Sequence, residues 1–387
     1  MIENHGKNRS KILIVAFNVL GLAAVVMLIL KAPYGFGTTD ECYYLNVPLR
    51  LVKGDWMLVD EWYSTQLFSF VVYPLVKLYM LIAGTTEGIL LIFRYIYIAV
   101  KVMACVYIYR RLRRICNMIP AFAAALLFLI YSPYNIMGLS YNSIGMITMS
   151  MAAVTLADNR KKGWLATAFS GFLFAIAVLC CPYLILAFVI YTLAMIITSV
   201  IKKESLILLK FMTWLKFTIG AAVCAVLFTA FVILRSPAGS VLQTLPHVLS
   251  DPAHQPVPFI TVVKEFLKAL IIWDKKRLVL LAVILLICIL CLCIKTLQKY
   301  RFAAFTVILI LNVIYVILPG YPCNMPNHYI LPVNIAGFAA FLLLKKRPWG
   351  LFVSTWILGF LYSFASFMSS NQGIYVLSSA SIVAALA

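Results

Sequence analysis

The chain has 387 residues, of which 64% are hydrophobic and 11% charged, and its mean hydropathy is +1.01. This composition excludes a soluble globular domain and predicts an all-α polytopic membrane protein. The net charge of +20 does not indicate a nucleic-acid partner, because the lysines and arginines gather in short clusters between apolar runs, as they do in cytoplasmic loops.

The first apolar run, 11–31, follows a basic start and lacks a small-residue cleavage site. We therefore predict an uncleaved first membrane span rather than a signal peptide. Further apolar runs of about 17 to 24 residues match the ~20-residue helix that crosses a bilayer. Basic clusters separate them at 7–11, 110–114, 160–162, 202–210, 295–301 and 345–347.

Placing all six basic clusters in the cytoplasm determines the remaining topology. After the first span, the expected spans are 89–109, 118–133, 143–157, 164–181, 184–201, 211–234, 278–294, 302–318, 329–344 and 350–367, with 374–387 as a twelfth. We therefore predict one membrane domain, 1–387, with about 11–12 spans in a cell membrane and a cytoplasmic N-terminus.

Two large segments, 32–88 and 235–277, then face the outside. Within the first, 67–83 is apolar enough to span, but a crossing there would move the 110–114 cluster outside. We therefore predict interfacial helices in the first outer segment, 67–83 among them, lying on the membrane surface. The second contains 261–273, whose apolar residues follow one helical face and also predict an interfacial helix.

Five of the twelve carboxylates lie close together in the first part of this outer segment, namely Asp40, Glu41, Asp55, Asp60 and Glu61. It reads GFGTTDECYY at 35–44, GDW at 54–56 and DEWY at 60–63, and its apolar stretch includes Pro74. This order resembles that of GT-C glycosyltransferases, in which an Asp-Glu pair just after the first span precedes a Gly-Asp-Trp-like turn and an interfacial helix with proline.

The resemblance continues in the Gly and Arg that lead the next span, here Gly84 and Arg94, and in a late aromatic-apolar-Pro motif at 327–332. Well-known relatives are the lipid A aminoarabinose transferases and the protein mannosyltransferases. The former carry Lys-Pro-Pro where this chain has Thr65-Gln66-Leu67, so the resemblance assigns no subfamily. It implies transfer of a sugar from a polyprenyl-phosphate donor to an unidentified acceptor at the extracytoplasmic face.

The resemblance places the family's catalytic acid at Asp40, the predicted general base for the acceptor, with Glu41 orienting the acceptor or sharing that role. An anionic leaving group also requires cations near the outer interface. The candidates are Arg94 and Lys101, which lie on nearly one face of a predicted span. For both, an ion pair or snorkelling that holds the bundle together is the alternative.

Other residues are candidates for binding the donor or the acceptor. His328 and Tyr329 are predicted contacts of the donor phosphate or lipid. Predicted acceptor or sugar contacts are Asp60, Glu61, Tyr63, Gln66, Tyr141 and Asn142. Capping of short helices is the alternative for the two carboxylates, and an aromatic turn is the alternative for Tyr141 and Asn142.

We predict no cofactor, no metal site and no nucleic-acid partner, although a divalent metal at the carboxylates stays an alternative. Membrane lipids and the donor are the expected partners. A second class of function, a transporter or a flippase of lipid-linked sugars, predicts charged residues along a central path. A third, a non-catalytic assembly partner in the cell envelope, predicts that Asp40→Asn keeps full function.

Overall fold

The computed structural model describes residues 2–35, 39–62, 64–133, 136–158, 163–201, 206–248, 258–271, 275–317, 337–343 and 352–369. Apart from one isolated β-bridge between Met57 and Glu61, these residues form helices and connections without strands. The predicted all-α fold is therefore confirmed for them. Three helices are long and apolar enough to cross a membrane, namely Ile14–Lys31, Ile89–Leu112 and Phe211–Arg235.

The helices follow the hydrophobic runs of the sequence. The first are α1 (Ile2–Lys31), α2 (Thr39–Lys53), α3 (Ser69–Ala83), α4 (Ile89–Leu112), α5 (Met118–Ile130), α6 (Tyr141–Ala157) and α7 (Trp164–Cys180). They are followed by α8 (Ile185–Ile201), α9 (Leu206–Arg235), α10 (Ala238–Thr244), α11 (Phe259–Ile271), α12 (Lys275–Cys293), α13 (Arg301–Ile317) and α16 (Leu358–Ser369). Residues 337–343 are also helical, whereas the expected segment 374–387 lies outside the described residues.

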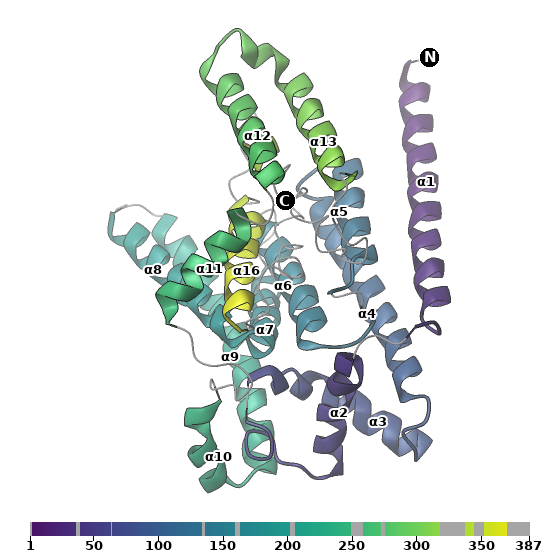
Figure 1. The fold of residues 1–387 in the computed structure, drawn as a ribbon, viewed down its shortest axis with the longest axis vertical. Coiled ribbons are helices and arrows are strands. Elements are labelled where there is room, and N and C mark those ends of the chain that lie inside the picture. Colours follow the sequence, from purple (N-terminus) through teal and green to yellow (C-terminus); the bar gives the residue numbers. More distant parts are fainter. Residues whose placement is uncertain are drawn as a thin grey trace.

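Helices α1 and α4 run in opposite directions. Arg94, early in α4, donates a hydrogen bond to Ala32, just after α1, at 2.6 Å. Phe17, earlier in α1, stacks on Phe122, whose ring also contacts Tyr109 late in α4. The connection between α1 and α4 therefore leaves and re-enters the bundle at one end, where α2 and α3 lie together (Figure 1).

The two ends of the bundle differ in charge. The acidic end holds α2, α3 and α10, with the carboxylates of the segment 32–88 (Figure 1). The basic end holds the C-terminal ends of α4 and α6, where the buried Asp158 accepts from Arg111 and Arg114 at 3.2 Å each. The tip of the α12–α13 hairpin, with Lys295 and Lys299, lies at the basic end as well (Figure 1).

The second predicted outer segment packs on the first. Ser236, after α9, donates to the carbonyl of Met57 at 2.9 Å, and Thr244 of α10 donates to the carbonyl of Leu58. Farther along, α11 covers most of the predicted amphipathic stretch 261–273. It buries Phe266 against three phenylalanine rings of α16, at centroid distances of 5.0 to 5.8 Å, so part of its apolar face is covered by protein.

Helices α7 and α9 approach so closely that their backbones touch at two glycines. A Cβ atom at Gly220 would overlap the carbonyl of Ala168, and one at Gly171 would overlap the carbonyl of Phe217. Small residues permit this close packing between helices in a membrane. The contact joins the central part of the bundle to α9, which ends at the acidic end.

Replacing Gly220 with alanine is expected to destabilise the protein by about 1–3 kcal/mol, because the added methyl group must push α9 away from α7. At a helix position where a methyl group has room, alanine stabilises the helix by about 1 kcal/mol relative to glycine. Gly21 of α1 has no atom within 4 Å of an added Cβ, so Gly21→Ala is the matched control. Thermal unfolding in detergent compares the two variants, and equal melting temperatures would contradict this packing.

Candidate functional site

The Asp-Glu pair occupies the first turn of α2, where carboxylates interact favourably with the helix dipole. Consecutive residues of a helix point in directions about 100° apart. Asp40 is accordingly exposed, whereas Glu41 is buried, with 2% of its surface accessible. The two neighbouring carboxylates therefore have different environments, and only Asp40 is open to an approaching molecule.

Glu41 forms a bidentate ion pair with Arg94. Nε of the guanidinium donates to Oε1 at 2.6 Å and Nη2 donates to Oε2 at 2.8 Å. Arg94 also donates to the carbonyls of Ala32 at 2.6 Å and Gly35 at 2.9 Å. Four of its five N–H groups are thus occupied. Of the two interpretations that the sequence leaves open for Arg94, the structure favours the ion pair, which joins α2 and the end of α1 to α4.

A small pocket adjoins this ion pair. Its lining residues are Glu41, Tyr44, Leu45, Leu90, Phe93, Arg94, Met137, Gly138 and Leu139. The Tyr44 ring packs edge-on against Tyr141 of α6, with centroids 5.5 Å apart, and against Phe68 at 6.2 Å. Tyr141 is therefore brought to the Glu41 side of the bundle, and Asn142 is buried next to it on α6.

Lys101 lies deeper in α4 and is completely buried. Its ammonium group donates to the carbonyl of Tyr131 and to Oγ of Ser132, the latter at 3.3 Å. It also lies 5.4 Å from the centre of the Tyr97 ring. No carboxylate of the described chain forms an ion pair with it, so neutral oxygens and a ring surround this cation.

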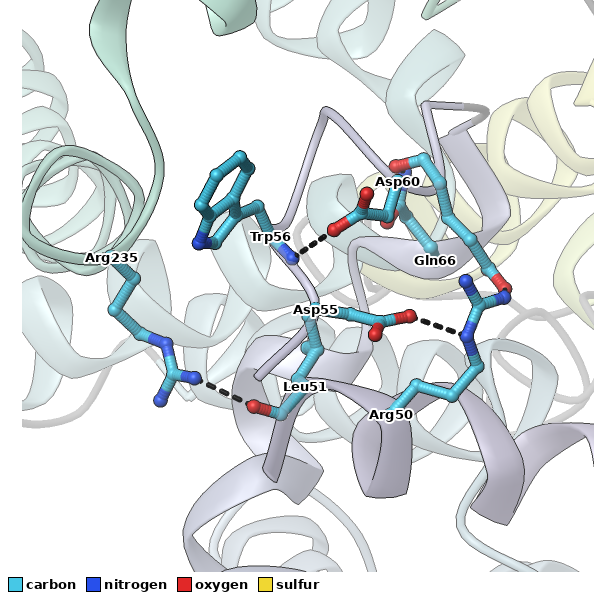
Figure 2. A network of polar contacts seen from close by, with 8 residues as sticks. Arg50, Leu51, Asp55, Trp56, Asp60, Gln66 and Arg235 are labelled. Atoms are coloured by element: carbon cyan, nitrogen blue, oxygen red, sulfur yellow. Dashed lines mark hydrogen bonds and ion pairs between the residues drawn. The ribbon is translucent and has the colours of Figure 1, made fainter. Parts of the chain in front are cut away.

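Three further acids of the first outer segment, Asp55, Asp60 and Glu61, take part in a separate group of polar contacts (Figure 2). Arg50 pairs with Asp55 at 2.5 Å and with Glu61. Asp60 accepts a hydrogen bond from the backbone N–H of Trp56 at 2.5 Å. Asp60 thus caps a turn rather than one of the short helices that the sequence suggested as an alternative.

Glu61 and Gln66 are joined by a hydrogen bond from Nε2 of Gln66 to the carbonyl of Glu61. Oε2 of Glu61 and Oε1 of Gln66 are buried and accept no hydrogen bond from the described residues. Burial raises the pKa of the Glu61 carboxyl above its usual value, Arg50 opposes this shift, and the charge of Asp55 adds to it. These two residues therefore lie together, with unused acceptor atoms.

Three predicted site residues, Tyr63, His328 and Tyr329, lie outside the described residues. Within the described ranges, no group of three or more His, Cys, Asp or Glu side chains is arranged to hold a metal ion. Comparison with known proteins finds no family model, no curated protein and no solved structure that matches this chain.

Sequence reasoning missed Tyr44 and Arg50, which connect the predicted residues to one another. Tyr44 ends the quoted stretch 35–44 but is one of many aromatic residues near an expected membrane interface. Arg50 is a single arginine outside the basic clusters and the expected spans, so neither residue was singled out. The Glu41–Arg94 pair, in contrast, could be anticipated from the sequence. An arginine inside an apolar span requires a partner, and a carboxylate just after the preceding span is at a suitable depth.

Proposed function

We propose that the chain is a glycosyltransferase of GT-C type that moves a sugar from a polyprenyl-phosphate donor to an acceptor at the extracytoplasmic face. The observation that supports it most is the arrangement of the Asp-Glu pair. Asp40 is exposed at the start of α2, while Glu41, bound to Arg94, fixes that helix start against α1 and α4. A base must be held in place to accept a proton efficiently.

In the proposed reaction, an acceptor hydroxyl or amine attacks the anomeric carbon of the donor. The bond between that carbon and the phosphate oxygen breaks, and polyprenyl phosphate leaves as an anion. The acceptor's proton passes to the Asp40 carboxylate, which is the catalytic residue. Glu41 and Arg94 are positioning residues, since they act through the start of α2. Glu61, Gln66 and Tyr141 are proposed contacts of the acceptor or sugar.

The proposed topology has about 11–12 spans, with the acidic end outside. The segregation of the charges supports this orientation, because Lys and Arg favour the cytoplasmic side. The α1–α4 arrangement returns the chain to the acidic end after α2 and α3, and therefore suits an interfacial position for α3. In this orientation Asp40 lies near the level of a lipid headgroup, where the anomeric carbon of the donor would be found.

The test is a transfer assay with the full chain in lipid nanodiscs. The protein is incubated with a panel of polyprenyl-phosphate sugars and candidate acceptors, and the release of polyprenyl phosphate is measured by mass spectrometry. The expected result is release that depends on the protein and on one donor of the panel. If no donor is consumed while binding of the donors is demonstrated, the transferase proposal is wrong.

A transporter or flippase is the second candidate, and one observation favours it. Lys101 is a completely buried cation in α4 whose contacts are neutral groups. Such a cation inside a span is typical of a substrate or ion path. The same assay discriminates the two functions, because a flippase moves the lipid-linked sugar between leaflets without breaking its bond to phosphate.

A further inference from the structure

Two cations lie beside one aromatic ring at the acidic end. The guanidinium carbon of Arg235, the last residue of α9, is 4.4 Å from the centre of the Tyr73 ring, and Nζ of Lys77 is 5.9 Å from it. Arg235 also donates to the carbonyl of Leu51 at 2.6 Å (Figure 2). A further hydrogen bond runs from its guanidinium to the hydroxyl of Tyr73. Across the described chain, no carboxylate forms an ion pair with either cation.

The position of these cations matches the boundary of the apolar surface. Arg235 ends a helix that is long and apolar enough to cross a membrane. The preceding Leu234 is 84% exposed, and Leu81 of α3 is 74% exposed. Lipid chains would cover such side chains, and cations at the end of a span then lie among the headgroups.

We propose that Arg235 and Lys77 bind the phosphate of an anionic bilayer phospholipid. Nε–H of Arg235 and the ammonium of Lys77 make no hydrogen bond to the described residues, so both can donate to phosphate oxygens. Tyr73 and Leu51 hold the guanidinium in place. Charge-assisted hydrogen bonds to phosphate are among the stronger ones in proteins. The bound lipid would join α3 to the end of α9, and this site does not depend on the proposed function.

The geometry argues against the phosphate of the proposed donor as the occupant. Leu51, which accepts from Arg235, follows Asp40 by 11 positions in α2. This corresponds to about 16 Å along the helix. The phosphate of a donor is bonded directly to the carbon that the acceptor attacks near Asp40. A phosphate at Arg235 is too far away, and therefore belongs to a phospholipid of the bilayer.

The test measures lipid retention by native mass spectrometry. The full chain is released from nanodiscs of phosphatidylcholine mixed with phosphatidylglycerol of the same acyl chains. The wild type is expected to retain phosphatidylglycerol preferentially. Removing one cation, in Arg235→Gln or Lys77→Gln, is expected to lower the ratio of retained phosphatidylglycerol to phosphatidylcholine about fivefold. Lys77 is exposed and makes no hydrogen bond among the described residues, so Lys77→Gln tests the site even where Arg235→Gln disturbs folding.

Lys53→Gln is the matched control, because it removes an exposed charge at the end of α2 that does not lie beside Tyr73. It is expected to leave the preference unchanged. The proposal is overturned if the wild type shows no preference, or if Lys53→Gln lowers it as much as Lys77→Gln does. Two competition arms are added. Displacement of phosphatidylglycerol by polyprenyl phosphate at equal concentration, or by inorganic phosphate alone, would also overturn it.

Discussion

Asp40→Asn is expected to lower the rate of sugar transfer by about 10²- to 10⁴-fold, the usual contribution of a general base. Asparagine has nearly the same size as aspartate but cannot take the acceptor's proton. Because Asp40 is exposed and Glu41 makes the ion pair, the substitution should leave the fold and donor binding unchanged. The loss should therefore appear in kcat rather than in KM for the donor.

Glu87→Gln is the matched control for this experiment. Glu87 is an exposed carboxylate in the connection between α3 and α4, at the same end of the bundle. Its replacement removes one negative charge but no proposed base, so the rate should stay near that of the wild type. An Asp40→Asn protein that transfers sugar at the wild-type rate would exclude Asp40 as the base.

Glu41→Gln is expected to destabilise the protein by about 3–5 kcal/mol, because it leaves the Arg94 charge buried without a counter-ion. Glu41 and Arg94 have only 3% and 8% of their side-chain surfaces exposed. Asp55→Asn breaks the more exposed pair with Arg50, whose side chains are 33% and 39% exposed. This control should lower stability by only about 1 kcal/mol or less.

The stability of each variant is measured by unfolding in mixed micelles with increasing denaturing detergent. The double variant Glu41→Gln, Arg94→Gln should recover part of the loss, since it removes both charges. A Glu41→Gln protein as stable as Asp55→Asn would mean that the Glu41–Arg94 pair does not hold α2 in place. In that case the positioning role proposed for this pair would also fail.

Many helices could be predicted, because apolar runs bounded by charge clusters indicate helices of about the length that a membrane span requires. Helices α4, α7 and α8 lie within a few residues of the expected 89–109, 164–181 and 184–201. Helix α5, with 13 residues, is shorter than the expected 118–133. Its last expected residues include Tyr131 and Ser132, which leave the helix and offer oxygens to Lys101.

The candidate site was less accessible to sequence reasoning, because its contacts join distant positions. Glu41 and Arg94 are 53 residues apart, and the pattern of charges alone does not decide which acid meets which base. The Asp-Glu motif predicted a catalytic role for Asp40 and Glu41 together and did not distinguish their environments. Their different burial depends on contacts between distant segments, such as the pairing of Glu41 with Arg94 of α4, which the local sequence does not contain.

The central claim is that the acidic end, with Asp40, faces the outside of the cell. Two natural cysteines test it directly. Cys42 is exposed on α2 at the acidic end, and Cys293 is exposed at the end of α12, at the basic end. A membrane-impermeant maleimide added to right-side-out vesicles, followed by peptide mapping, should label Cys42 at once and Cys293 only after permeabilisation. Labelling of Cys293 with protection of Cys42 would contradict the account.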